Sequence, residues 1–201
     1  TEITRLEAGQ AITTGDTLAF DLCIYAAGFR CAPLAQMAGL AVNAKNQIVV
    51  NAFLHSISHP DIYAVGDAAA FEQSADLSVR MGCVTAIPLA IHAAENLARL
   101  LTGRPEQPFG FGFIIRCISL GRHNGLVQFT DAIDRPRPQA ITGRAAAMIK
   151  ELILHYVMQT LKFERRFAFY RWPQARMAHP TGVAAHAPRP TEALVTKMVN
   201  R

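Results

Sequence analysis

The sequence predicts an α/β protein that continues into a smaller α+β region. Short apolar runs that end at glycines, such as the run closed by Gly28, are typical of buried sheet strands. One long segment, 85–101, has apolar residues at helical spacing. Later, Asn124-Gly125 joins two apolar runs, which is the strongest short signal for an antiparallel hairpin.

Strand and turn signals alternate in the first part of the chain. Residues 1–18 are predicted to form a strand, a turn at Thr14-Gly15-Asp16 and a returning strand. Three apolar runs predict further strands, the first of them buried: Leu22 to Tyr25, Ile48 to Val50, and Ile62 to Val65. The predicted helix Thr85 to Leu101 has its stop signal at Gly103 and Pro105. Pro88 fits only in its first turn, where a missing N–H costs little.

The last third of the chain predicts a different arrangement. After the hairpin, "DRPRPQ" (134–139) is expected to be a loop or linker. Residues 143–161 are predicted to form an amphipathic helix. Its core-facing residues are expected to be Met148, Leu152, Tyr156 and Val157. The final stretch of about 25 residues is expected to be irregular because it is rich in proline, alanine and isolated charges.

Composition limits the classes of protein. The 201 residues, 51% hydrophobic and 17% charged, are those of an ordinary globular chain. The four cysteines form no CxxC pair, so a zinc ribbon or dithiol motif is excluded and a cytosolic setting is expected. The charge-free stretch 81–94 is too short to span a bilayer.

Charge is distributed unevenly. Residues 1–140 carry 10 Lys and Arg against 12 Asp and Glu, a balance of −2, whereas residues 141–201 carry 10 against 3, a balance of +7. A basic C-terminal third favours an anionic surface such as lipid or nucleic acid. A solvated helical face explains the same charges equally well.

A lone carboxylate, Asp67, follows the third apolar run in "DIYAVGDAAAF". At the end of a strand, Gly66-Asp67 would offer close backbone approach and a strong acceptor for sugar-like hydroxyls. An aspartate that caps the next turn is the competing interpretation.

The segments "FDLCIYAAGFRCAPL", "QIVVNAFLHSISHPDIYAVGDAAAF" and "IPLAIHAAENLARLL" follow one another at a spacing that resembles a known family. They resemble the C-terminal half of flavoproteins with two dinucleotide-binding domains, in particular the type II NADH dehydrogenase branch of the pyridine nucleotide oxidoreductases. The match covers about residues 15–105. The resemblance implies part of a three-layer, Rossmann-like FAD/NAD(P)-binding fold, with FAD and NAD(P)H as cofactors.

The resemblance also implies cofactor-binding residues. Asp67 would hydrogen-bond the ribityl chain of FAD, Gly66 would let that chain approach, and Ala68 would follow in the same motif. The helix start, with Pro88, Ile91 and His92, would face the flavin. Ile91 stands where glutamine is common in the family. Ala27 and Gly28 would lie near the nicotinamide nucleotide.

No catalytic side chain is expected, because hydride transfer from NAD(P)H through the flavin is cofactor chemistry. His92 is a second-tier candidate acid, with an exposed position beside Glu95 and Arg99 as the alternative. The scattered His and Cys residues fit no metal template, so no metal is predicted. The lack of a dithiol leaves a quinone or another small molecule as the acceptor.

The segment "LKFERRFAFYRWPQAR" interleaves aromatic side chains with arginines. Phe167, Tyr170, Arg171 and Trp172 suit peripheral contact with the inner face of a membrane, where a quinone is dissolved. Aromatics that pack back onto the protein are the alternative, base stacking is a weaker one, and a homodimer stays open.

Neither G-x-G-x-x-G turn of a complete enzyme of this kind occurs in the sequence. We therefore expect the C-terminal part of a longer FAD-dependent NAD(P)H dehydrogenase, inactive by itself. Its expected parts are the end of an NAD(P)H domain (1–43), an FAD-domain segment (44–105), an α+β domain (106–180) and an irregular tail (181–201). The alternative is a non-catalytic basic module that binds membrane or nucleic acid.

Overall fold

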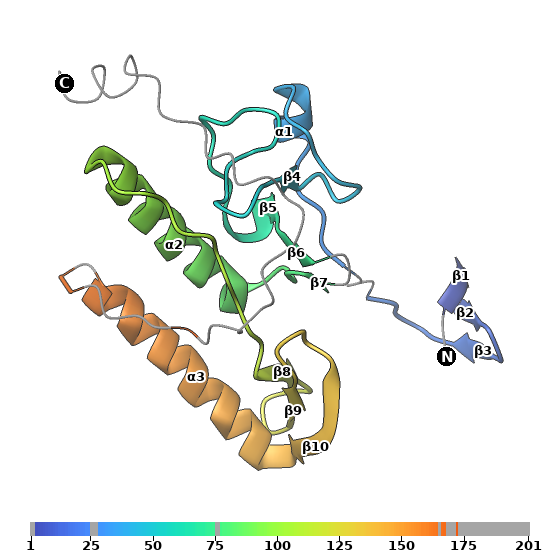
Figure 1. The fold of residues 1–201 in the computed structure, drawn as a ribbon. Helices are drawn as coiled ribbons and strands as arrows, with labels where there is room; N and C mark the ends of the chain where they lie inside the picture. Colours follow the sequence, from blue (N-terminus) through green and yellow to red (C-terminus); the bar gives the residue numbers. More distant parts are fainter. Residues whose placement is uncertain (1–2, 25–27, 75–76, 165, 168–171, 173–201) are drawn as a thin grey trace.

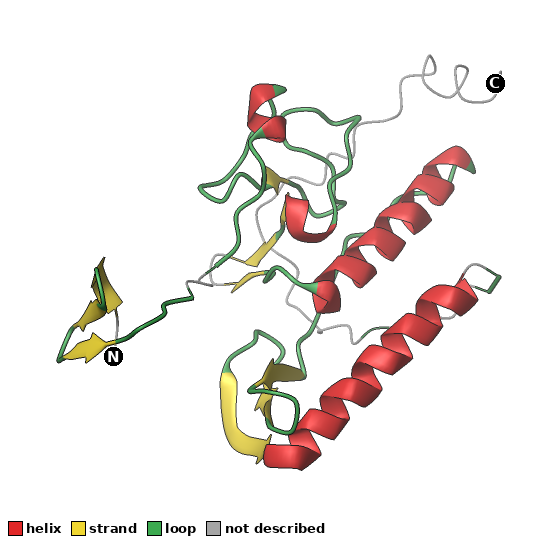
Figure 2. Ribbon diagram, turned by 180° about the vertical axis from the view of Figure 1, so that it is seen from behind, coloured by secondary structure: helices red, strands yellow, loops and turns green. Residues whose placement is uncertain are grey.

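The computed structural model describes residues 3–24, 28–74, 77–164, 166–167 and 172. It is a mixed α/β structure in which two long helices, α2 and α3, lie side by side, with small sheets around them (Figure 1). Figure 2 shows the same arrangement from behind.

The N-terminal strands form a small antiparallel sheet that stands away from the rest (Figure 1). The strands are β1 (Ile3–Glu7), β2 (Gln10–Thr13) and β3 (Thr17–Ala19). The predicted turn joins β2 to β3, where the Thr13 hydroxyl oxygen accepts the backbone N–H groups of Gly15 and Asp16. The strand, turn and return expected here are therefore confirmed, with an additional turn at Gly9.

The prediction of a buried strand at Leu22 to Tyr25 was wrong for its described residues. Residues 22–24 are not in a strand, and the side chains of Leu22 and Ile24 are 78% and 82% exposed. Tyr25 lies outside the described residues. An apolar run forms a buried strand only where neighbouring strands and covering helices receive it, and the described residues bring none to this segment.

Residues 28–71 hold short elements linked by ordered loops. They include α1 (Leu34–Met37), β4 (Ile48–Val49), the 3₁₀ turn η1 (Gly66–Ala68) and β5 (Ala69–Ala70). Strands β4 and β5 pair in parallel, Ile48 opposite Ala69 and Val49 opposite Ala70. The strand predicted at Ile48 to Val50 is thus present, one residue shorter. Two further short strands, β6 (Glu72–Ser74) and β7 (Leu77–Ser78), pair with each other.

The strand predicted at Ile62 to Val65 was wrong. Tyr63 forms only an isolated bridge with His55, and Ala64 N–H donates to the Leu54 carbonyl. These bonds occupy the backbone of the segment, so that it folds onto the 54–56 loop and does not join β4. The Gly66-Asp67 pair therefore lies in a turn between loop and strand rather than at the end of a strand.

Helix α2 spans Cys83–Leu101, so it begins earlier than predicted. Pro88 is consequently inside the helix and not in its first turn. Its ring nitrogen has no hydrogen to give to the carbonyl of Val84, four residues earlier. The face of α2 that contains Pro88, Leu89 and His92 is buried.

The C-terminal part is a three-stranded antiparallel sheet covered by a helix. Its strands β8 (Ile115–Ser119), β9 (Gly125–Thr130) and β10 (Pro136–Thr142) lie in the order β10-β9-β8. The hairpin predicted at Asn124-Gly125 joins β8 to β9. The loop predicted at 134–139 was wrong, because its last four residues belong to β10. Prolines are tolerated there since β10 is an edge strand with an irregular register between Pro136 and Ala140.

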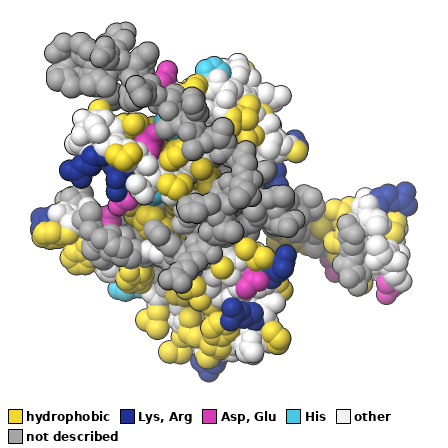
Figure 3. Space-filling model, in the orientation of Figure 1, with side chains coloured by type: hydrophobic (Ala, Val, Ile, Leu, Met, Phe, Trp, Pro, Cys, Tyr) yellow, Lys and Arg dark blue, Asp and Glu magenta, His cyan; other side chains and the backbone are white. Residues whose placement is uncertain are grey.

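Helix α3 (Gly143–Glu164) crosses this sheet with Ala146 against Gly125. The predicted core face was wrong: Met148, Leu152 and Tyr156 are more than half exposed, and the buried residues are Ala146 and Thr160. A small sheet covers only a narrow strip of the helix, and small side chains permit the closest approach. Hydrophobic side chains gather on the surface over α3 and the β8–β10 sheet (Figure 3).

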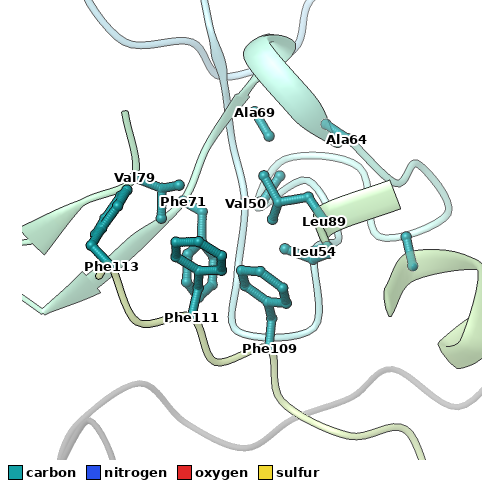
Figure 4. Close-up of a cluster of buried hydrophobic side chains, with 11 residues drawn as sticks. Val50, Leu54, Ala64, Ala69, Phe71, Val79, Leu89, Phe109, Phe111 and Phe113 are labelled. Atoms are coloured by element: carbon teal, nitrogen blue, oxygen red, sulfur yellow. The ribbon is translucent and has the colours of Figure 1, made fainter. Parts of the chain in front are cut away.

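The main core lies between α2, the β4–β5 region and the segment before β8. Phe109, Phe111 and Phe113 point into it from that segment and meet Phe71 and Leu89 (Figure 4). The rings of Phe71 and Phe109 pack edge to face with centroids 5.2 Å apart. Because this core includes residues of α2 and of the β4–β5 region, it fixes η1 relative to the helix.

Candidate functional site

The turn η1 meets the N-terminal end of α2. Gly66 has φ +63°, a left-handed backbone conformation that residues with a side chain rarely adopt. A Cβ at this position would lie 3.5 Å from the Cβ of Ala86 on α2. A glycine at this position therefore permits the turn conformation and lets the turn lie against the helix.

Asp67 joins the turn to the helix directly. Its Oδ1 accepts a hydrogen bond of 2.6 Å from the backbone N–H of Gly82, the residue before the first turn of α2. The side chain is otherwise exposed. A carboxylate has about four lone-pair sites, so one bond leaves acceptor capacity for a ligand. The helix dipole favours an anion at this end.

The backbone of the turn is held from the opposite side by residues that the sequence did not point to. Gln47 Nε2 donates to the carbonyl oxygens of Asp67 (3.0 Å) and Ala69 (3.1 Å), and the Cys31 thiol lies 3.1 Å from the Asp67 oxygen. Gln47 belongs to the polar run "NAKNQ" (43–47), whose composition is typical of a loop. No local signal distinguishes a bridging glutamine from a solvated one.

Other predicted cofactor residues are placed as follows. Ala68 is exposed in η1, next to Asp67. Gly28 has φ +83° and an exposed position three residues before Cys31, so its segment lies near the turn. Ala27 lies outside the described residues. Pro88 is fully buried in α2, away from the helix end that Asp67 caps.

His92 is buried, so the alternative of an exposed position beside Glu95 and Arg99 was wrong. Its Nε2 lies 2.8 Å from the carbonyl oxygen of Gln107, and its ring packs edge to face on Phe109. Asn96, also buried, forms two hydrogen bonds with the Gln107 backbone, through Nδ2 and Oδ1 (each 2.9 Å). These contacts make His92 part of the anchor that ties the 106–113 segment to α2.

Ile91 faces an apolar groove between α2 and α3. The groove has a volume of about 360 Å³ and is lined by Ile87 and Ile91 on one side and by Thr160 and Leu161 on the other. Ala86, the neighbour of Gly66, also lines it, so the groove begins beside the turn. Its size and apolar lining suit a small, flat organic molecule.

A buried polar cluster lies behind the turn. His55 Nε2 and the Tyr63 hydroxyl lie 2.8 and 2.6 Å from Glu106 Oε1, and His55 Nδ1 lies 2.6 Å from the carbonyl oxygen of Pro60. Burial, the hydrogen bond to Glu106 and its charge raise the pKa of Tyr63 above its usual range. The cluster ties the loop before the Gly-Asp motif to the linker that leads to the C-terminal sheet.

Comparison with known proteins agrees with this geometry. A model of the pyridine nucleotide-disulphide oxidoreductase family matches residues 1–96, which include the η1 turn and most of α2. Residues 1–96 belong to this family. The resemblance drawn from the sequence motifs is therefore confirmed at the level of the family.

A curated protein and a solved structure extend the comparison. A type II NADH:quinone oxidoreductase of Haemophilus influenzae is 30% identical over 148 residues, which are 73% of this chain and 33% of that protein. The structure of the sulfide:quinone oxidoreductase from Aquifex aeolicus has a TM-score of 0.62 and 16% identity, over 90% of this chain and 48% of that one. The match thus spans about a third of the curated relative's length, and the structural neighbour shows the fold alone.

The proposed membrane residues are only partly placed. Phe167 is exposed, whereas Tyr170 and Arg171 lie outside the described residues. Trp172 packs inward: its Nε1 donates to the carbonyl oxygen of Gly110 at 3.2 Å, and its ring contacts the core around Phe109. For Trp172 the alternative of packing back onto the protein was the correct one.

Among the residues that the structure describes, no group of three or more His, Cys, Asp or Glu side chains is arranged to hold a metal ion. None of the helices placed in the structure combines the length and apolar character that a membrane span needs.

Proposed function

We propose that this chain is part of an FAD-dependent oxidoreductase that oxidises NAD(P)H and passes electrons to a quinone-like acceptor. Support comes from the family match and from the relative named as an NADH:quinone oxidoreductase. Residues 1–43 and 44–105 would belong to Rossmann-like NAD(P)H and FAD domains, and 106–180 to the α+β domain, with 181–201 as a tail. The FAD pyrophosphate would be held by residues outside this sequence, so residues 1–201 alone would bind flavin weakly.

The observation that carries this proposal is the turn at the end of α2. Gly66 adopts a left-handed conformation against Ala86, and Asp67 presents an exposed carboxylate beside the helix N-terminus. A polyol with several hydroxyl donors fits such an acceptor. Gly66, Asp67 and Ala68 would therefore hold the ribityl chain of FAD, and Gly28 with Ala27 would lie towards the nicotinamide nucleotide.

The cofactor, when bound, supplies the hydride and electron transfer. The chain's own residues have other roles. Asp67 would accept hydrogen bonds from the cofactor and orient it. The dipole of α2 favours negative charge at the site. His92 has its Nε2 committed to Gln107 and supports the helix from within the core. We assign it no role in proton transfer.

The acceptor site is proposed to be the groove between α2 and α3. The groove is mostly apolar, begins beside Ala86 and contains Ile91. An isoleucine there would contact a quinone ring through dispersion forces and would donate no hydrogen bond. Replacement of Ile91 by Asp is expected to raise the KM for a soluble quinone and to leave flavin content unchanged.

A membrane contact is proposed for α3. Met148, Leu152, Tyr156 and Phe163 recur along one side of the helix and are all more than half exposed. A substrate dissolved in lipid would reach its binding site most directly if the protein lay on the bilayer surface. Leu152→Glu is expected to reduce co-sedimentation with anionic lipid vesicles, whereas Leu154→Glu, on another side of α3, would reduce it less.

The central test uses the protein expressed from its complete gene. We expect a stoichiometric flavin absorbance after purification and oxidation of NADH that depends on an added soluble quinone. Asp67→Ala should weaken flavin binding about tenfold or more, since hydrogen bonds to charged groups contribute about 1.5–3 kcal/mol.

The matched control is Asp16→Ala. Asp16 also accepts a backbone N–H, from Thr17 at 2.7 Å, in the exposed turn between β2 and β3 of the N-terminal sheet. The Asp16→Ala variant should bind flavin as tightly as the wild type does. A wild-type protein without flavin, or an Asp67→Ala variant with unchanged flavin affinity, would contradict the proposed function.

A further inference from the structure

Gln47 makes an unusual set of contacts for a loop glutamine. Its side chain is 4% exposed, and both hydrogens of its amide are directed at backbone carbonyls, those of Asp67 (3.0 Å) and Ala69 (3.1 Å). The Asp67 carbonyl also accepts the Cys31 thiol. A buried amide with all its donors used holds its acceptors firmly, because breaking the bonds would leave polar atoms without water or a partner.

Asn43 sets the orientation of this amide. Asn43 Nδ2 donates to Gln47 Oε1 at 3.0 Å, and Asn43 Oδ1 accepts the backbone N–H of Gln47 at 3.0 Å. The two carbonyls that face Nε2 can only accept, so a flipped Gln47 amide would place oxygen against oxygen. The hydrogen bonds at Oε1 and at Nε2 therefore permit only one orientation of the Gln47 amide.

The position of Gln47 explains why the turn needs such support. Strands β4 and β5 pair over only two residues each, and the ladder begins at Ala69, directly after η1. Gln47 directly precedes β4, and its side chain continues the ladder by one step in place of a peptide group. Without it, the carbonyls on one side of the turn would have no strand to bind them.

We propose that Gln47 is the positioning residue that holds η1 in the conformation in which the Asp67 carboxylate meets a flavin polyol. The inference rests on the proposed function for its ligand. Gln47 binds the backbone carbonyl of Asp67, whereas the carboxylate of Asp67 makes a separate hydrogen bond with Gly82. Gln47 acts on the ligand only through Asp67.

The test is Gln47→Met in the complete protein, because methionine keeps the length and removes both donors. We expect flavin affinity to fall about fivefold to tenfold, and hydrogen exchange at residues 66–70 and at the Gly82 amide to be about tenfold faster. The matched control is Gln128→Met. Gln128 Nε2 likewise binds two backbone carbonyls, those of Arg137 and Gln139, but in the C-terminal sheet, and its loss should change neither quantity.

A double-mutant cycle separates positioning from general support. If Gln47 acts through Asp67, Gln47→Met should weaken flavin binding by less than about twofold once Asp67 is alanine. Additive losses, or unchanged exchange at Gly82 in Gln47→Met, would overturn the inference. If Gln47→Met does not fold, flavin affinity and hydrogen exchange are measured in Asn43→Ala instead, because loss of the Asn43 side chain allows the Gln47 amide to rotate.

The outcomes keep the two proposals apart. A wild-type protein that binds no flavin would refute the proposed function and the ligand assigned here. The exchange measurement needs no flavin, so it would still decide whether Gln47 holds the turn.

Discussion

The carboxylate of Asp67 accepts a hydrogen bond of 2.6 Å from the backbone N–H of Gly82. This bond satisfies a backbone donor at the start of α2, and in the proposed function the same side chain also accepts hydrogen bonds from a flavin polyol. The two interpretations that the sequence left in competition, ligand acceptor and cap, are compatible in one side chain. A ligand bound at Asp67 would be coupled to the N-terminal end of α2.

Removal of the Asp67 carboxylate should destabilise the protein even without a ligand. We expect Asp67→Ala to lower the free energy of unfolding by about 1 kcal/mol, the typical cost of losing a capping acceptor. Asp67→Asn keeps an oxygen for Gly82 and should lose only a few tenths of that amount. Urea unfolding measures both, and equal midpoints for the two variants would refute the capping role.

An added side chain at Gly66 should strain the turn. Alanine would fit in space, since its Cβ would lie 3.5 Å from Ala86, an ordinary contact. The left-handed φ of +63° is the source of the cost, about 1–2 kcal/mol for a residue with a Cβ. Gly15→Ala is the control, because Gly15 has no left-handed φ and no neighbour within 4 Å of a Cβ. Thermal unfolding should show a lower midpoint for Gly66→Ala alone.

Stability should fall at alkaline pH because of Tyr63. Its pKa is raised by burial and by Glu106, so the folded state keeps the phenol proton at a pH where the unfolded chain releases it. The contribution is complete below the unfolded pKa, about 10, and is lost as pH rises through the folded value. Tyr63→Phe should flatten the fall in stability above pH about 10, whereas Tyr156→Phe, an exposed tyrosine on α3, should not.

A methyl group at Gly125 should disturb the contact of α3 with its sheet. The added Cβ would lie 3.1 Å from the Ala147 nitrogen and 3.3 Å from both Ala146 C and Ile118 O, all backbone atoms that cannot move independently. We expect Gly125→Ala to destabilise the protein by about 1–3 kcal/mol, as overpacked sites do. Gly110→Ala, with no neighbour within 4 Å, serves as the comparison. Similar urea midpoints for both variants would contradict this packing.

Several parts of the fold followed from local chemistry and were predictable. The turn at Gly15-Asp16 and the hairpin at Asn124-Gly125 depend on the backbone freedom of a few adjacent residues. The long helix α2 depends on periodic apolar residues. Pairing of neighbours in sequence needs no knowledge of distant segments, so the signal is complete in the sequence itself.

The errors share a physical cause. Leu22, Met148 and Leu152 are apolar and were expected in a core, but burial depends on whether another element covers the residue. His92 was expected at the surface or at the flavin and is packed on Gln107, and Trp172 was expected at a membrane and is packed near Phe109. For His92 and Trp172, the contacting residues lie far away in the sequence. For Leu22, Met148 and Leu152, no element among the described residues covers the side chain.

The sequence alone determined the Gly66-Asp67 pair and the long helix that follows it, because turn residues and hydrophobic period are local properties. Only the tertiary structure decided that Asp67 bonds Gly82, that Gln47 holds the turn from behind and that Ile91 faces a groove with α3. Each of these contacts joins residues that are far apart in sequence. Contacts of this kind are fixed by the packing of the core, which no short stretch of the chain encodes.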